Sequence, residues 1–226
     1  MTNGNSYLSF DGTQTYIEIP THPDFSVATT GELTVSAWIR PETLTFDKTE
    51  GLHGSRYIHW LGKGERGQLE WTFRMYSQDT GDGRGNRISF YVFNPEGGEG
   101  IGSYFQDELQ AGQWMHIVGA ADSQWTYIYR DGVRRDSDVY AGKIIPTAGN
   151  APLRIGTRDF HSFFQGEIRE VRIWNRRLSD AEIAELYNAG SGSTDGLMAE
   201  YLLTQDIAPD SAGSHNGFIY APTWIS

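Results

Sequence analysis

The sequence has no cysteine, few basic residues and no long apolar run. Without cysteine the 226-residue chain can form no disulfide, thiolate zinc site, iron–sulfur cluster or cysteine nucleophile. No run of about 18 apolar residues is present that could span a bilayer. The 18 basic residues face 29 acidic ones, a net charge of -11 that repels phosphate backbones. We therefore expect neither nucleic acid nor membrane insertion among its interactions.

Several catalytic motifs are missing as well. The sequence contains no E-x-D-x-x-E carboxylate pair, no H-E-x-x-H, no G-x-S-x-G and no P-loop. These absences favour a binding function over a catalytic one. The start of the chain, Met1 to Tyr7, lacks a basic and apolar secretory signal. The sequence as it stands thus predicts a cytoplasmic location, and secretion if a leader precedes it.

Aromatic side chains are plentiful. They make up 13% of the chain, as 7 Trp, 12 Tyr and 11 Phe. Intrinsically disordered chains have few aromatic residues, so we expect a globular protein whose core is built largely from rings.

Most of the chain shows the pattern of short strands. Leu33 to Arg40 (LTVSAWIR) alternates between two sets of side chains, and Pro41 ends the run. Leu69 to Tyr76 and Ile88 to Phe93 alternate in the same way. The face expected to meet the core carries Trp71, Phe73 and Phe90.

Turn residues separate further strands along the chain. Asp131 and Gly132 are typical of a tight hairpin turn. The other predicted strands are 114–121, 125–129, 153–156, 168–174 and one that starts within 196–203. Regularly spaced short strands favour an all-β fold, a two-sheet antiparallel jelly-roll sandwich.

One short helix is expected near the C-terminal third. Ser179 and Glu182 form an S-x-x-E capping box, Ile183 and Leu186 give an apolar face, and Gly190 stands where a C-cap belongs.

Six blocks of sequence resemble the successive strands of the laminin G-like, concanavalin A-like lectin/glucanase jelly rolls. In chain order they are FDGTQTYIEIP (10–20), LTVSAWIRP (33–41), QWMHIVGAAD (113–122), YIYRDGVRRD (127–136), LRIGTRD (153–159) and FFQGEIREVRIWNRRLSDAEIAELY (163–187). The resemblance implies the two-sheet fold. It is less informative about function, because lectins, glycanases and adhesion modules share this scaffold.

The segment 196–224 resembles one that in many members of this family precedes the FDG strand. We predict a single domain over residues 1–226, in which 196–226 supplies closing strands. The alternative is a truncated second repeat, which would expose apolar side chains at a cost of about 25 cal/mol per Å². The side chains concerned are Leu197, Tyr201, Phe218 and Trp224.

The sheet face opposite the core is the first candidate site. Pyranose rings stack on aromatic side chains through their C–H faces, and their hydroxyls pair with planar polar groups. The predicted ligand-binding residues of this face are His59, Arg74, Tyr76, Tyr91, Asn94 and Tyr104. The alternative is an ordinary solvent-facing sheet on which these residues only pair across strands.

A rim loop is the second candidate. Arg158 and Asp159 are predicted ligand-binding residues, with Phe160 and His161 beside them, because binding residues concentrate on loops of a rigid scaffold. In the alternative interpretation, an Arg158–Asp159 pair braces the loop over a buried Phe160.

The resemblance also implies a structural calcium site, with Asp11 of the FDG block as its metal ligand. A second acid usually stands where this chain has Arg169. We therefore predict that Arg169 replaces the cation and pairs with Asp11, so that no cofactor is required and calcium is not expected there. Asp79 and Asp82 form a weaker alternative ion site.

These observations predict a non-catalytic, lectin-like carbohydrate-binding module with a glycan or polysaccharide partner. The first alternative is a polysaccharide lyase or glycoside hydrolase on the same scaffold, since His59, Arg74, Tyr76 and Tyr91 are suitable residue types. The second is a structural or adhesion module that binds another protein.

Overall fold

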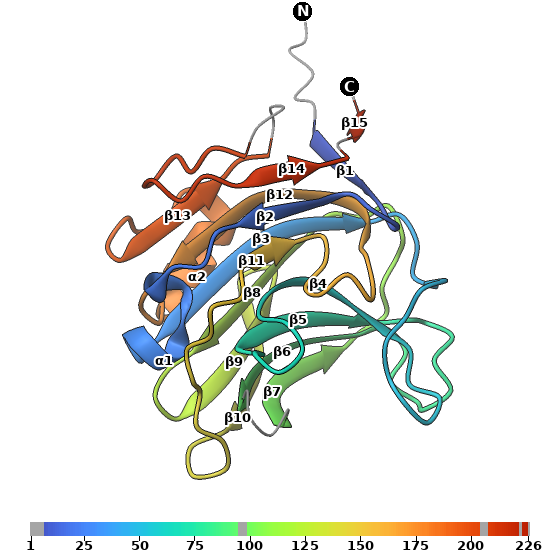
Figure 1. Ribbon diagram of the computed structural model, residues 1–226, viewed down its shortest axis with the longest axis horizontal. Helices are drawn as coiled ribbons and strands as arrows, with labels where there is room; N and C mark the ends of the chain where they lie inside the picture. The colour runs from blue at the N-terminus through green and yellow to red at the C-terminus, as the bar shows by residue number, and fades with distance from the viewer. Residues whose placement is uncertain (1–6, 95–98, 204–207, 222, 226) are drawn as a thin grey trace, which may run out of the picture.

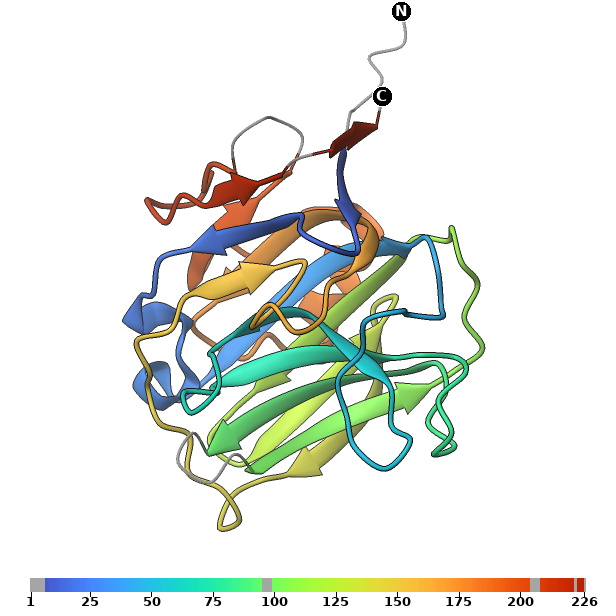
Figure 2. The ribbon, with the colours of Figure 1, turned by 45° about the vertical axis from the view of Figure 1, so that its right-hand side comes forward.

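The computed structural model describes residues 7–94, 99–203, 208–221 and 223–225. Two antiparallel sheets face each other and enclose the core between them (Figures 1 and 2). This is the all-β jelly-roll sandwich that the strand pattern predicted. In the described part of the chain, no helix is long and apolar enough to cross a membrane.

The first sheet has eight strands in the order β10-β9-β8-β3-β12-β1-β15, with β13 also paired to β12. Its strands are β1 (Tyr7–Asp11), β3 (Leu33–Pro41), β8 (Met115–Ala121), β9 (Trp125–Arg130), β10 (Val133–Val139), β12 (Gln165–Trp174), β13 (Leu197–Tyr201) and β15 (Thr223–Ile225). Strand β3 lies at its centre, between β8 and β12.

The second sheet has seven strands in the order β14-β2-β11-β4-β5-β6-β7. Its strands are β2 (Tyr16–Ile19), β4 (Tyr57–Lys63), β5 (Trp71–Tyr76), β6 (Arg87–Asn94), β7 (Glu99–Gln106), β11 (Leu153–Ile155) and β14 (Phe218–Tyr220). A short 3₁₀ helix (Pro23–Phe25) and α1 (Val27–Thr30) lead from β2 back to the first sheet.

Aromatic side chains fill the space between the sheets. Trp71, Phe73 and Phe90 are fully buried there, as the alternation predicted. The rings of Phe73 and Phe90 lie 4.9 Å apart, and the indole N–H of Trp71 donates to the carbonyl of Phe25 at 2.8 Å. A buried indole with a satisfied N–H adds apolar contact without the cost of an unpaired polar group.

The hairpin between β9 and β10 forms at the expected turn. Asp131 and Gly132 both have positive φ, 50° and 78°, as a two-residue hairpin turn of the primed type requires. A Cβ at Gly132 would also lie 3.0 Å from the Cβ of Tyr187 in the neighbouring helix. Glycine is therefore needed both for the turn and for the close approach.

Helix α2 (Asp180–Ala189) begins and ends as predicted. The Ser179 hydroxyl accepts from the backbone N–H of Glu182, the Glu182 carboxylate accepts from that of Ser179, and Gly190 is the left-handed C-cap. The helix packs on the outer face of the eight-stranded sheet, where it creates a second apolar cluster. Its members are Val118, Ala120, Tyr127, Tyr129, Trp174, Leu178, Ile183 and Leu186.

The C-terminal segment adds strands to both sheets (Figure 1). Strand β13 pairs with β12, β14 with β2, and β15 with β1. Tyr201 is fully buried, whereas Phe218 is 60% exposed; the side chain of Trp224 lies outside those described. A single domain over residues 1–226 remains our proposal, and these strand pairings support it.

Candidate ligand-binding site

The outer face of the seven-stranded sheet carries most of the predicted ligand-binding residues. Strands β4, β5, β6 and β7 are neighbours, and their register places His59 opposite Arg74 and Ser89 opposite Tyr104. Asn94 differs, because strand alternation puts it on the side opposite to Tyr91. Phe93, one residue earlier, shares the face of Tyr91, with the two ring centroids 6.2 Å apart.

Arg74 is the centre of this face. Its guanidinium carbon lies 4.7 Å from the ring centre of Tyr57 and 4.6 Å from that of Tyr91. Its Nε donates to Nε2 of His59 at 2.9 Å. Within the described part of the chain, no protein hydrogen bond is recorded for its two terminal nitrogens. Three rings, those of Tyr57, Tyr91 and Phe93, and one histidine thus hold the guanidinium while its donor groups stay available.

His59 supports Arg74 from beneath the surface. The side chain is only 1% exposed, and its Nδ1 lies 2.6 Å from a carboxylate oxygen of Glu50. A neutral imidazole with its proton on Nδ1 can donate to Glu50 and accept from Arg74 at once. Burial, with the charges of Arg158 and Arg74, lowers the pKa of His59 well below its usual value. His59 therefore orients Arg74 and does not face the solvent.

A cavity of about 570 Å³ opens beside Arg74. Three loops contribute to its wall: the loop between β3 and β4, the loop between β5 and β6, and, through His161, the loop between β11 and β12. The lining residues are Thr49, Glu50, Gly51, Leu52, Ser55, Tyr57, Arg74, Tyr76, Arg84 and His161. The cavity therefore combines rings, cationic groups and one carboxylate, a mixture that suits a polyol.

Tyr76 lines the cavity but is only 1% exposed. Arg84, from the loop that follows β5, lies 4.9 Å from the Tyr76 ring centre and donates to its hydroxyl at 3.2 Å. Arg84 is itself held by Asp82 and Ser55. The face of the Tyr76 ring is thus covered by protein, and the stacking expected of it would require the loop to move.

Tyr104 lies on the edge strand, away from the lining of the cavity. Its side chain is 42% exposed, and the guanidinium of Arg87 covers its ring at 3.8 Å. It is a second, separate aromatic surface on the same sheet.

The rim loop differs from both interpretations of its sequence. Arg158 is 4% exposed and forms an ion pair with Asp159, whose side chain is also buried. The pair braces the loop, but Phe160 is not buried beneath it. Phe160 is 45% exposed and has a positive φ of 66°. It packs edge-on against Tyr16 at 5.1 Å. From this loop, Phe160 and His161 are the side chains that a ligand could reach.

Asp11 does not pair with Arg169, so this expectation was wrong. One Asp11 carboxylate oxygen accepts the backbone N–H groups of Thr13, Gln14 and Thr15 at 2.8 to 3.0 Å. Partial burial raises the pKa of Asp11, but these three donors outweigh it and hold the pKa far below its usual value. The pairing fails because Arg169 lies four residues beyond the β12 residue that is in register with Asp11. Its guanidinium instead lies over the rings of Trp38 and Trp114, at 5.0 and 4.5 Å from their centres.

A cavity of about 270 Å³ lies beside Asp11, and Asp47 and Gln165 also line it. These side chains offer oxygen ligands of the kind calcium takes, although calcium needs six to eight of them. With Arg169 elsewhere, the original reason for expecting no calcium at Asp11 is lost. Asp79 and Asp82, the weaker ion site, are engaged by Arg56 and Arg84.

The sequence reasoning missed seven of the ten residues that line the cavity beside Arg74, and three of the seven have ring or charged side chains: Tyr57, Glu50 and Arg84. Tyr57 was within reach of the alternation argument, because it lies two residues before His59 on the same strand. Glu50 and Arg84 come from loops, where no periodicity indicates which way a side chain points.

A family model described as the concanavalin A-like lectin/glucanases superfamily matches residues 11–184. A search of curated proteins found no significant match.

Several solved structures have a similar fold at low sequence identity. A candidate carbohydrate-binding protein from Bacteroides ovatus has a TM-score of 0.63 and 18% identity, with 97% of this chain and 60% of that chain covered. A heptameric SAP-like pentraxin from Limulus polyphemus has a TM-score of 0.58 and 15% identity, covering 85% and 83%. Domain 4 of an extracellular arabinanase from Geobacillus stearothermophilus, solved with arabinotriose, has a TM-score of 0.51 and 20% identity, covering 70% and 67%.

Proposed function

Because this chain belongs to the concanavalin A-like lectin/glucanases superfamily, we propose that it is a non-catalytic carbohydrate-binding module. The glycan lies in the cavity beside Arg74. Among the structures of similar fold, one is a candidate carbohydrate-binding protein and another is a domain solved with arabinotriose, which supports a glycan partner.

The observation that carries the proposal is the fixed but unsaturated guanidinium of Arg74. It lies between Tyr57 and Tyr91 in a cavity of about 570 Å³, with its Nε already bonded to His59. A planar guanidinium can donate two parallel hydrogen bonds to neighbouring hydroxyls or to a carboxylate. Since its rotamer is already fixed, little conformational entropy is lost when a sugar binds.

The ligand that fits this arrangement is a short stretch of a neutral or acidic glycan. Vicinal hydroxyls, or the carboxylate of a uronic acid, pair with the terminal nitrogens of Arg74. The ring of Tyr57, which lines the cavity, and the apolar surface of Leu52, which is 78% exposed, then meet the C–H groups of the sugar.

The geometry gives less support to a lyase. A lyase needs a base with a free lone pair next to the sugar, but both ring nitrogens of His59 are engaged. Burial is the main cause that raises the pKa of Tyr57 and of Tyr91, which makes their phenolates harder to form.

A glycan array tests the proposal, followed by titration of the best ligands with variants. Arg74→Ala should weaken binding at least tenfold, and Arg74→Lys should recover only part of it, because a point charge cannot replace the planar donor pair. Arg66→Ala is the matched control, because Arg66 is exposed and does not line the cavity. Thermal melting of each variant separates lost binding from lost folding.

Two outcomes would contradict the proposal. Unchanged binding in Arg74→Ala would place the glycan elsewhere, and an array without any signal would remove the lectin function.

Incubation with alginate, pectin and β-glucan should release neither unsaturated products nor reducing ends; a release of either would favour the catalytic alternative. Calcium has no part in the proposed contacts, so adding it to dialysed protein should leave binding through Arg74 unchanged.

A further inference from the structure

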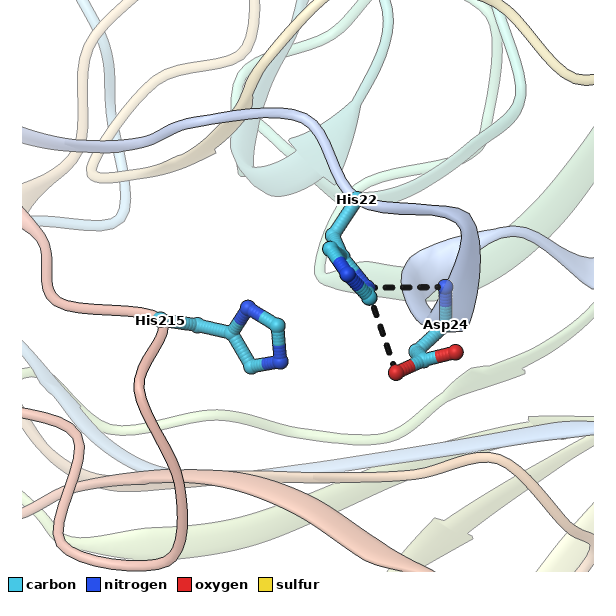
Figure 3. Close-up of side chains that lie close together, drawn as sticks. All are labelled: His22, Asp24 and His215. Atoms are coloured by element: carbon cyan, nitrogen blue, oxygen red, sulfur yellow. Dashed lines mark hydrogen bonds and ion pairs between the residues drawn. The ribbon is translucent and has the colours of Figure 1, made fainter.

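A second group of chemically versatile side chains lies far from the cavity beside Arg74. His22 and Asp24 come from the turn that follows β2, and His215 comes from the C-terminal segment that precedes β14 (Figure 3). One potential ligand atom from each lies within 4.8 Å of those from the other two. All three side chains are partly exposed, so an ion could reach them.

His22 and Asp24 already have the spacing of two ligands on one ion. Nδ1 of His22 lies 3.1 Å from Oδ2 of Asp24. Ligand atoms at about 2.0 to 2.1 Å from a tetrahedral zinc ion are about 3.3 Å apart. The same Nδ1 lies 3.3 Å from the backbone N–H of Asp24. Without an ion, Nδ1 of His22 therefore faces both the backbone N–H and the carboxylate of Asp24. If Nδ1 carries a lone pair it can accept only from the N–H, and if it carries a proton it can donate only to the carboxylate.

His215 is brought to this pair by a well-anchored backbone. Its carbonyl accepts from the hydroxyl of Tyr201 at 2.6 Å, and its N–H donates to the carboxylate of Asp210 at 3.0 Å. Its ring lies 4.3 Å from the ring of His22 and 4.8 Å from that of Phe25, centre to centre. Figure 3 shows the His215 ring reaching toward His22 and Asp24 from the opposite segment.

One other group of this kind occurs among the described residues, formed by Glu50, His59 and Asp159. It is unsuitable for a cation, because both nitrogens of His59 are engaged and Arg158 lies within 4.0 Å of both carboxylates. Asp24, the carboxylate of the first group, forms no ion pair with any lysine or arginine that the structure describes. The chain as a whole carries a charge of -11, which favours a cation.

We propose that His22, Asp24 and His215 bind one divalent transition-metal ion, with zinc as the best match. Two imidazole nitrogens and one carboxylate are ligands for zinc and its neighbours, not for calcium or magnesium, which take oxygen. The partial exposure of the group leaves room for water as the fourth ligand.

The ion joins two segments that are distant in sequence. His22 and Asp24 lie 193 and 191 residues before His215 in the chain. A metal clip of this length constrains the unfolded chain and also fastens the C-terminal segment to the turn that follows β2. The site therefore predicts a zinc-dependent rise in stability.

Calorimetry on untagged full-length protein, dialysed free of metal and titrated with zinc chloride, tests the site. We expect one zinc per chain with a dissociation constant in the micromolar range or below, and no saturable binding of calcium at this site. His215→Ala and Asp24→Asn should each weaken zinc binding at least tenfold. His53→Asn is the matched control; His53 is exposed in another loop, and asparagine tolerates its positive φ of 55°.

A second readout uses cobalt in place of zinc. Cobalt should give the visible absorption bands of a nitrogen and oxygen site in the wild type and in His53→Asn, but not in His215→Ala. Zinc should also raise the melting temperature of the wild type and leave that of His215→Ala unchanged. The proposal is overturned if no zinc binds at 100 µM, or if the double variant His22→Ala/His215→Ala binds zinc as well as the wild type. If His215→Ala fails to fold, Asp24→Asn, which keeps the shape of the side chain, decides the matter.

Discussion

The two sheets have the same alternating strands, yet their outer faces differ. On the eight-stranded sheet, α2 covers the part of the outer face that carries Trp174 and Tyr129, and both side chains are completely buried. On the seven-stranded sheet, none of the helices in the described part of the chain covers the strands around Arg74 (Figure 1), and arginine side chains lie between the rings instead. Side chains that point away from the core can therefore form a second apolar cluster where a helix covers them, or a binding surface where they stay open to solvent.

The difference also separates stability from binding. Apolar burial under α2 stabilises the fold, whereas the arginine and ring pairs of the other face fix donor groups next to a cavity. Substitutions on the two faces should accordingly affect different measurements.

Trp174→Ala should have the largest effect on stability. Trp174 is fully buried beneath α2, and its indole N–H donates to the carbonyl of Ser193 at 2.8 Å. Truncating a buried tryptophan costs about 3 to 5 kcal/mol of unfolding free energy, which urea denaturation measures. Glycan binding by the folded fraction should be unchanged; a loss of binding at full folding would show that the two faces are coupled.

Acid should destabilise the protein through one buried histidine on each face. Burial, with the charge of Arg172, lowers the pKa of His116 to about 4, and the pKa of His59 is also well below 6.5. Since the unfolded chain takes up these protons first, stability falls as the pH drops below about 6.5, by up to about 1.4 kcal/mol per pH unit for each histidine. Urea denaturation between pH 7.5 and 5 measures this slope.

His116→Gln should remove the contribution of His116 to the pH dependence of the unfolding free energy and leave the contribution of His59. An unchanged slope would mean that His116 is protonated in the folded protein as readily as in the unfolded chain.

Ser179→Ala should cost about 1 kcal/mol, because it removes the side chain that caps α2. Ser191→Ala, an exposed serine just beyond the same helix, is the control and should change stability by less than about 0.5 kcal/mol. Equal effects of the two substitutions would show that the cap does not hold the helix on the sheet.

Tyr104→Ala should have the smallest effect. The side chain is 42% exposed, and its main contact is the guanidinium of Arg87. An exposed contact of this kind contributes about 0.5 to 1 kcal/mol, so thermal melting should show only a small shift. A loss as large as that of Trp174→Ala would contradict the distinction between the two faces.

Local patterns predicted much of this architecture. Alternation identified Trp71, Phe73 and Phe90 as core residues, and the residues Asp131 and Gly132 predicted the hairpin turn that forms. The S-x-x-E motif and Gly190 located α2. Each of these features depends on interactions between residues that are close together in the chain, so a local sequence pattern is enough to predict it.

The site was predicted only in part. Alternation brought His59, Arg74 and Tyr91 to one face, but it could not show that His59 lies beneath Arg74 or that Arg84 covers Tyr76. The separation between Asp11 and Arg169 depends on the register of β1 on β12, and a pattern shared by many proteins does not fix which side chains end up opposite each other in this one.

The sequence by itself determined the fold class, the aromatic core and the short capped helix, because periodicity and capping act over short distances along the chain. Only the tertiary structure decided which outer face is covered, which guanidinium groups keep donors free, and that His22 and Asp24 meet His215. Those outcomes depend on contacts between residues far apart in sequence, whose distances and directions follow from the packing of whole sheets and loops.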